Sequence, residues 1–242
     1  MIVNCDARSL EVSVAAYLSQ DPILMREIIE GFDIHEANRA MLGLPSRLIA
    51  KVFVFRLIYG GSAYAYSVDT DFAICGFSAK KWQEIIDKFY SKYKGLAQWH
   101  TSLIQQVVST GFLKMPTGRE YHYEAKPDYK GEMKWPRTTI LNYPVQGLGA
   151  DLMAIARVDF AKRFQDNKIK GVLINTVHDS IEVDVMNIDE VKRTSKLFFE
   201  TFQTIPQNFK AIFGVEYNLP MFCEVSYGQN RKDLKEILLT EC

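Results

Sequence analysis

Residues 171–185 read GVLINTVHDSIEVDV, and this stretch decides the fold class. Apolar and β-branched residues nearly alternate with other residues on both sides of a polar centre, residues 178–180. Two such runs around a short polar break predict a β-hairpin with a polar tip. Further short apolar runs, MIVN at residues 1–4 and FCEV at residues 222–225, predict strands near the two ends of the chain.

The sequence between these strands is helical in pattern. Apolar residues recur at helical spacing, and Asp33, Ser46 and Ser78 stand where N-cap residues are expected. We expect helices over residues 9–30, 33–41, 46–60, 78–109 (one or two), 145–165 and 189–202, and a hairpin or loop over residues 111–135. The fold class is therefore α+β, with a helical insert between strands.

The bulk composition is that of a globular protein. The chain has 242 residues, of which 48% are hydrophobic and 24% charged, and this excludes collagen-like, low-complexity and disordered classes. The length allows one large domain or two small ones. Because 29 Lys plus Arg balance 29 Asp plus Glu, the net charge is zero, and composition alone predicts a protein that does not bind DNA.

Targeting signals and cysteine frameworks are not expected either. No apolar run approaches the ~20 residues of a membrane span, and the N-terminus lacks a basic region followed by an apolar one. The four cysteines, Cys5, Cys75, Cys223 and Cys242, are far apart and form no C-x-x-C pair. We therefore expect reduced cysteines, no zinc site, no membrane partner and a cytoplasmic location.

One predicted helix carries a stripe of cations and aromatic rings. Residues four apart on a helix lie only ~40° from each other around its axis, so one stripe contains Arg47, Lys51, Phe55 and Tyr59. Two cations at one end and two rings at the other match a nucleoside triphosphate, which has phosphates for the charges and a base and sugar for the rings. The alternative is a core helix with two cations that extend to solvent.

Two aspartates stand beside predicted strands. Asp6 follows the first strand, and Asp179 lies at the tip of the predicted hairpin. If these strands were neighbours, the two carboxylates would repel each other unless a divalent cation lay between them, an arrangement that suits Mg²⁺ and substrate phosphates. The alternative is that both are ordinary turn or cap residues.

A further polar segment, NYPVQG at residues 142–147, precedes a helix expected over residues 150–163. Asn142 and Gln146 are typical caps at such an entrance. Their side chains are equally suited to the minor-groove acceptors of base pairs, which vary little with sequence.

Together these segments resemble the C-terminal half of the polymerase domain of family A DNA polymerases. VNCDARSLEVSVAAYLSQD (3–21) resembles motif A, RLIAKVFVFRLIYGGSAY (47–64) motif B, and NTVHDSIEV (175–183) motif C. LNYPVQGLGADLMAIA (141–156) and FDIHEANRAMLG (32–43) are similar to two further family segments. The order and spacing agree, and the resemblance runs from Val3 to about Asn230.

The resemblance implies helical fingers inserted in an antiparallel-sheet palm, with no thumb. It places palm at residues 1–20 (motif A), fingers at 21–140 (motif B helix 46–60) and palm again at 141–242 (motif C hairpin 171–185). In the family, a thumb and often an exonuclease precede motif A. We therefore expect a split polymerase completed by a second polypeptide that bears the thumb and an exonuclease; the other explanation is an artificially cut fragment.

The resemblance also implies roles for individual residues. It assigns catalysis to Asp6, Asp179 and Lys51; metal binding to Asp6, Asp179 and the backbone of Ala7; dNTP binding to Arg47, Lys51, Phe55, Tyr59, Glu11 and His35; and primer–template contacts to Asn142, Gln146 and His178. Lys51 is expected to act as general acid toward pyrophosphate, and Glu11, packed against Tyr59, to exclude ribonucleotides. Two Mg²⁺ ions, with Mn²⁺ as an alternative, are the implied cofactors.

Four positions depart from the family pattern. Ala7 replaces an aromatic residue, Arg8 a serine, Ser180 a carboxylate, and Arg56 a small residue. We expect Ser180 to weaken metal affinity or primer positioning and Arg56 to add a cation to its helix. Neither metal-binding aspartate is lost, so an active site is still expected.

The predicted function is that of a DNA-directed DNA polymerase subunit or fragment that adds dNTPs to a primer 3′ end in DNA replication. Its partners would be primer–template DNA and dNTPs, and its location the cytoplasm, that of a bacterial host if the source is a phage. The main alternative is a non-catalytic subunit that binds DNA or a polymerase. A two-metal nuclease is disfavoured, because it has no use for the motif B stripe.

Overall fold

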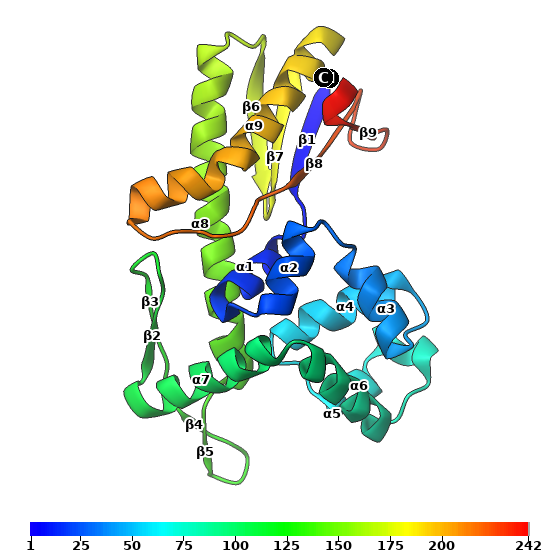
Figure 1. Ribbon diagram of the computed structural model, residues 1–242, viewed down its shortest axis with the longest axis vertical. Helices are drawn as coiled ribbons and strands as arrows, with labels where there is room; N and C mark the ends of the chain where they lie inside the picture. Colours follow the sequence, from blue (N-terminus) through cyan, green and yellow to red (C-terminus); the bar gives the residue numbers. More distant parts are fainter. Residues whose placement is uncertain (242) are drawn as a thin grey trace. The chain divides into compact units, whose positions relative to one another are not determined.

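The computed structural model describes residues 1–241, so Cys242 lies outside the described residues (Figure 1). Its elements are β1 (Ile2–Ala7), α1 (Leu10–Ser19), α2 (Pro22–Ile29), α3 (Ile34–Leu42), α4 (Arg47–Ile58), α5 (Ala63–Val68), η1 (Thr70–Cys75), α6 (Ala79–Lys92), α7 (Lys94–Thr110), β2 (Phe112–Lys114), β3 (Glu120–His122), β4 (Lys126–Pro127), β5 (Met133–Lys134), α8 (Arg137–Asp166), β6 (Gly171–Val177), β7 (Ser180–Val185), α9 (Ile188–Phe213), β8 (Cys223–Gly228), β9 (Lys235–Ile237) and η2 (Leu239–Glu241).

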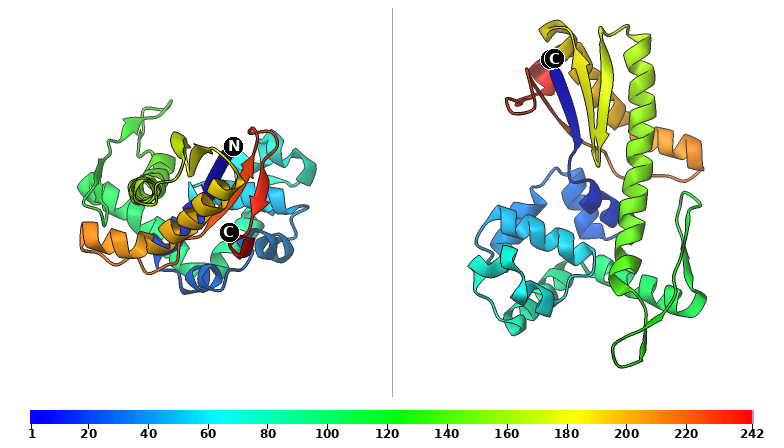
Figure 2. Two further views of the ribbon diagram at one scale, coloured as in Figure 1. Left: turned by 90° about the horizontal axis from the view of Figure 1, so that it is seen from above. Right: turned by 180° about the vertical axis from the view of Figure 1, so that it is seen from behind.

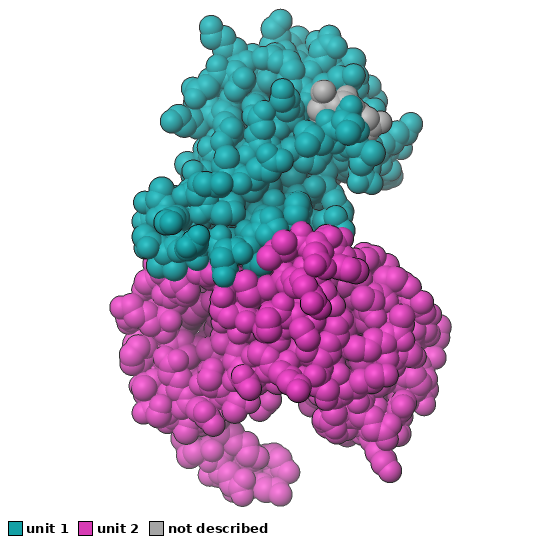
Figure 3. Space-filling view, viewed as in Figure 1, with its two compact units in different colours: residues 1–10, 147–242 teal, residues 11–146 magenta. Residues whose placement is uncertain are grey.

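The chain forms two compact units, drawn in teal and magenta in Figure 3. Unit 1 contains residues 1–10 and 147–242, and unit 2 contains residues 11–146. The mixture of helices and antiparallel strands confirms the predicted α+β class. Within the described residues, no helix is both long and apolar enough to span a membrane.

Unit 1 is built on a five-stranded antiparallel sheet in the order β6-β7-β1-β8-β9. The predicted hairpin over residues 171–185 is confirmed as β6 and β7. Side chains alternate along each strand, and one face of the sheet buries Val3, Cys5, Ile181 and Val183. Helix α9 lies against β1 and β8 (Figures 1 and 2).

Helices α8 and α9 are joined by aromatic packing. The rings of Phe160 and Phe198 are fully buried and stacked, with centroids 3.8 Å apart and planes 4° apart. Each such ring removes a large apolar area from water, and a stacked pair contributes ~0.5–1.5 kcal/mol beyond that burial. This contact fixes the helical layer of unit 1.

Unit 2 is mostly helical and has an aromatic core. Side-chain caps begin its helices where the sequence predicted them: Asp33 accepts from Glu36 N at 3.0 Å, Ser46 from Ile49 N at 3.2 Å, and Ser78 from Lys81 N at 3.3 Å. Five rings pack with neighbouring centroids 5.1–5.9 Å apart: Phe53, Tyr66, Phe72, Trp82 and Phe89.

Two predicted boundaries of unit 2 are refined. The helix expected over residues 9–30 is divided, because Gln20 has a left-handed φ of 49° and Asp21 caps a new helix that begins at Pro22. Residues 111–135 form two hairpins, β2–β3 and β4–β5. Leu113 of the first hairpin packs in a buried cluster with Val107.

The segment at residues 142–147 does not precede a helix, as the sequence predicted, but lies inside one. Helix α8 begins at Arg137 and continues through Pro144. Proline normally ends or kinks a helix, because it lacks an N–H and its ring crowds the preceding turn. Here Leu141 and Val145, on either side of the proline, are fully buried, so packing holds the helix together. Helix α9 likewise continues past the predicted end at residue 202, through Pro206, to Phe213.

Candidate active site

The sheet of unit 1 brings Asp6 and Asp179 together. Strand β1 pairs with β7 so that Asp6 stands opposite Ser180, the residue that follows Asp179. The backbone N–H of Ala7 donates to the carbonyl of Asp179 at 2.9 Å. The condition for the metal-site hypothesis, that the two strands are neighbours, is therefore met, and both aspartates lie at one end of the sheet.

The hairpin tip is a tight two-residue turn made by His178 and Asp179. His178 has a left-handed φ of 51°, which two-residue hairpin turns require and which His tolerates better than most residues. The hydroxyl of Ser180 donates to the carbonyl of Val177 at 3.0 Å, so this side chain closes the turn. His178 is exposed and Asp179 half-buried, so both can be reached from solvent.

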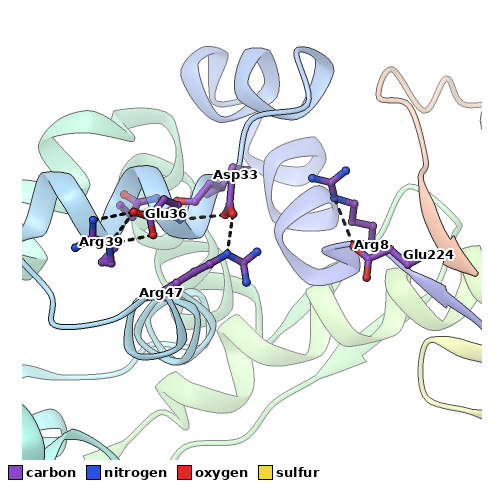
Figure 4. A network of polar contacts seen from close by, with 8 residues as sticks. Arg8, Asp33, Glu36, Arg39, Arg47 and Glu224 are labelled. Atoms are coloured by element: carbon purple, nitrogen blue, oxygen red, sulfur yellow. Dashed lines mark hydrogen bonds and ion pairs between the residues drawn. The ribbon is translucent and has the colours of Figure 1, made fainter. Parts of the chain in front are cut away.

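Other carboxylates around the sheet are neutralised by cations of the same chain. Arg231 binds the buried Glu182 of β7, and Arg8 lies 3.8 Å from Glu224 of β8 (Figure 4). The N-terminal ammonium lies 2.8 Å from Asp184. Sequence analysis missed the pairing of Glu182, although a glutamate at a buried strand position requires a partner.

The oxygen donors at this end of the sheet suit a cation that also binds the substrate. No group of three or more His, Cys, Asp or Glu that could hold a metal occurs among residues 1–241. The strand register supplies two carboxylates, Asp6 and Asp179, beside the backbone of Ala7. Mg²⁺ typically binds one or two carboxylates and completes its shell with waters and substrate phosphates. The residues present therefore fit Mg²⁺ or Mn²⁺ bound together with a phosphorylated substrate.

In unit 2, helix α4 presents the predicted stripe on its accessible side. Its core face is buried and consists of Ala50, Phe53, Val54, Leu57 and Ile58. The stripe is different: Arg47 and Lys51 are exposed, and Phe55 and Tyr59 are half-buried. The helix thus has a packed face and a separate face that a ligand can reach.

An acidic residue orients the first cation of the stripe. Arg47 Nε donates to Asp33 Oδ2 at 2.7 Å, as Figure 4 shows. Burial alone would raise the pKa of Asp33, but hydrogen bonds from Arg47 and from the Glu36 backbone outweigh it and lower that pKa. The second cation, Lys51, lies with its ammonium 5.6 Å from the ring centroid of Phe55.

His35 is a buried neutral base beside these cations. Its side chain is 4% exposed, and its Nδ1 has no hydrogen-bond partner among the described residues. Its ring lies 5.5 Å from that of Phe55. Burial, followed by the charges of Arg47 and Lys51, lowers the pKa of His35 to about 4. An unpaired polar atom next to two cations is consistent with an anionic ligand at this place.

Helix α8 contributes two amides one turn apart. The side-chain amide of Gln146 donates to the hydroxyl of Tyr59, which links α8 to the end of α4. Asn142 lies four residues before it, on the same side of the helix, and is half-buried. Glu11 lies in the first turn of α1 and is also half-buried.

Arg56, the added cation of the stripe helix, is paired within unit 2. Its guanidinium binds both Asp69 and Asp71 and lies 5.2 Å from the ring centroid of Phe72. The spacing in sequence gave no sign of this pairing, since both acids come from the η1 region. Arg56 therefore stabilises unit 2 internally.

Comparisons with known proteins agree with this picture. The sequence profile of DNA polymerase family A matches residues 1–233. DNA polymerase I of Aquifex aeolicus is 28% identical over 196 residues, which cover 75% of this chain and 32% of that protein. DNA polymerase I of Caldicellulosiruptor bescii is 24% identical over 246 residues, covering 97% of this chain and 27% of that protein.

A solved structure has the same fold. It is the POL domain of Pol1 from M. smegmatis in complex with DNA primer-template and dNTP, which superposes with a TM-score of 0.75 at 18% identity. The match covers 95% of this chain and 39% of that one. This chain belongs to DNA polymerase family A. It spans about a third or less of the length of the two curated relatives.

Proposed function

We propose that this chain is the palm-and-fingers part of a DNA-directed DNA polymerase that adds dNTPs to a primer 3′ end. The observation that carries the proposal is the strand register that joins Asp6 and Asp179 in a member of family A. The accessible stripe of α4, with cations at one end and rings at the other, supports the same substrate.

The metal-binding end would serve the chemistry. Asp6, Asp179 and the carbonyl of Ala7 would hold two Mg²⁺ ions, or Mn²⁺, together with the triphosphate. Two ions held in this way activate the attacking 3′ oxygen and stabilise the leaving pyrophosphate. Lys51 would donate a proton to that pyrophosphate as general acid.

The remaining side chains would position the substrates. Arg47, Lys51 and His35 would bind the triphosphate, and Phe55 and Tyr59 the sugar and base. Glu11 would block a ribose 2′-hydroxyl. Primer–template contacts would come from Asn142, Gln146 and His178, of which Gln146 is already ordered by its hydrogen bond to Tyr59.

A second polypeptide bearing the thumb, and an exonuclease, would complete the enzyme. Phosphate contacts supply much of the affinity for DNA, so a polymerase needs an extended cationic surface along the duplex. This chain has zero net charge, and Arg8, Arg47, Arg56 and Arg231 each lie beside a carboxylate of the same chain. The place of action would be the cytoplasm, or that of the bacterial host if the source is a phage.

The test is primer extension by this chain alone and with thumb-bearing chains encoded beside it. We expect template-directed extension that needs a divalent cation and, at nanomolar concentration, a second chain. Extension by the isolated chain at that concentration would contradict the need for a partner. DNA binding without extension in every combination would favour the alternative, a non-catalytic subunit.

A further inference from the structure

The sheet of unit 1 has a polar face as well as the apolar face described above. Strands β1 and β7 pair Asp6 with Ser180, and residues directly opposite each other in an antiparallel pair lie on the same face. Two residues further from the hairpin tip, the same strands pair Asn4 with Glu182. Because side chains alternate along a strand, these four residues share one face, which ends at the tip that carries Asp179.

This polar face contains a buried charge with an exposed partner. The side chain of Glu182 is 9% exposed, and its Oε2 accepts a hydrogen bond from Nη2 of Arg231, whose side chain is 57% exposed. A buried carboxylate destabilises a protein unless it is paired, so Glu182 requires the arginine. The arginine is less restricted, because a guanidinium has five N–H donors and is accessible here from solvent. Arg231 can therefore satisfy Glu182 and bind a second anion at the same time.

The loop between β8 and β9, residues 229–234, holds Arg231 over this face. β1 lies between β7 and β8 in the sheet, so the loop and its arginine together bridge β1. The loop is ordered by Asn230, whose Nδ2 donates to Asp233 Oδ2 at 2.6 Å and whose Oδ1 accepts from the backbone N–H of Lys232 at 2.8 Å. The guanidinium is thus held at both ends before a ligand arrives, which lowers the entropic cost of binding.

The distance from the metal-binding end suits the backbone of a DNA strand. Glu182 comes three residues after Asp179, and three residues of a strand span about 10 Å. Successive phosphates of one DNA strand advance about 3.4 Å along the axis of the duplex. A primer that ends at Asp6 and Asp179 therefore has phosphates within reach of Arg231 about three nucleotides or fewer from its 3′ end.

We propose that Arg231, held by Glu182, binds a phosphate of the primer strand close to its 3′ end. This inference rests on the proposed function, which places the primer terminus at the two aspartates. The ligand is a phosphodiester, which a guanidinium binds through charge-assisted hydrogen bonds of its planar fork. The contact would hold the primer end against the metal-binding residues. The competing explanation is an ion pair that only neutralises Glu182.

The first measurement compares two variants that differ only in the cation. Glu182→Gln keeps Arg231, whereas Glu182→Gln/Arg231→Gln removes it, and neither leaves a buried carboxylate unpaired. Each binds a labelled primer–template in the form, alone or with the proposed thumb-bearing chain, in which the unaltered protein extends primers. We expect Glu182→Gln to bind at least as tightly as the unaltered protein. The double variant should bind about tenfold more weakly, with a salt dependence that is shallower by about one phosphate contact.

Lys235→Gln is the matched control for this comparison. Lys235 is also an exposed cation of the sheet, but it pairs with Tyr227, which stands opposite Val3 on the apolar face. The control should therefore bind the primer–template normally. Equal affinity of Glu182→Gln and the double variant would overturn the proposal, because an ion pair that only neutralises Glu182 predicts that result.

The second measurement identifies the phosphate and starts from the unaltered protein, so it does not depend on the folding of a variant. Primer phosphates are replaced one at a time by uncharged methylphosphonates. We expect the binding loss assigned to Arg231 within about three nucleotides of the 3′ end, and we expect the double variant to lack it. Equal binding of all these primers by the unaltered protein, a loss that persists unchanged in the double variant, or a coupling to template phosphates alone would each overturn the contact.

The inference and the proposed function can fail separately. If the unaltered protein extends primers but Glu182→Gln and the double variant bind equally, the Arg231 contact is wrong and the proposed function stands. If the unaltered protein neither binds nor extends a primer–template, alone or with a thumb-bearing chain, both are wrong.

Discussion

The buried His35 makes a prediction about the stability of unit 2 in acid. Its folded-state pKa is about 4, lowered by burial and by Arg47 and Lys51, whereas an unperturbed histidine titrates near 6.5. Because the folded pKa is the lower one, the unfolded chain takes up the proton first as the pH falls. The contribution of His35 to stability is therefore complete above pH 6.5 and is lost progressively between pH 6.5 and 4.

The size of this effect follows from the two pKa values. A pKa of about 4 in place of 6.5 means that the neutral ring is favoured by about 3 kcal/mol more in the folded protein than in the unfolded chain. Between pH 7 and pH 5, about 2 kcal/mol of this would be lost. His100 is also buried and has a pKa of about 4, so the whole protein should lose more than His35 alone accounts for.

The assay is urea unfolding of the unaltered protein and of His35→Asn at pH 7 and pH 5. Between pH 7 and pH 5, the free energy of unfolding of the variant should fall by about 2 kcal/mol less than that of the unaltered protein, because the variant lacks the titrating group. NMR titration of the ring should give a pKa near 4, which should rise when a dNTP brings its phosphates nearby. A measured pKa at or above 6.5, or equal pH dependence of the two proteins, would refute the reasoning.

Three further substitutions give separate tests. Glu11→Ala should raise ribonucleotide incorporation relative to dNTP incorporation; an unchanged ratio would show that Glu11 does not guard the sugar. Phe55→Tyr should improve the use of dideoxynucleotides in primer extension, and equal chain termination would remove Phe55 from the sugar site. Phe198→Ala should lower the free energy of unfolding by about 3–5 kcal/mol, because the ring is fully buried against Phe160; a loss below 1 kcal/mol would contradict the stacked core.

Local signals predicted much of the fold. The hairpin over residues 171–185 was found because strand periodicity and a polar break are properties of the sequence itself. The caps Asp33, Ser46 and Ser78 were found for the same reason, since each binds an N–H only three residues away. The register that joins Asp6 to the hairpin followed once the two strands were taken as neighbours.

Long-range packing could not be predicted in the same way. Residues 142–147 were predicted to precede a helix, but buried residues on both sides of Pro144 hold α8 together through this segment. Arg56 was predicted as an added cation, and its pairing with Asp69 and Asp71 could not be predicted, because both acids lie more than ten residues away in sequence. The neutral state of His35 depends on a burial that its sequence neighbours do not indicate. The catalytic and binding roles of the site residues remain predictions.

The central claim is that Asp179, at the hairpin tip, binds the metal ions on which nucleotidyl transfer depends. It is tested most directly by the single-turnover rate of dNTP incorporation, measured for Asp179→Asn and for the matched control Asp184→Asn on β7, each in the form, alone or with the proposed thumb-bearing chain, in which the unaltered protein extends primers. We predict that Asp179→Asn lowers the rate at least ~1000-fold with DNA binding retained, because it removes a charge that holds the ions, and that Asp184→Asn stays near the unaltered rate. Equal rates for the two variants would contradict the account.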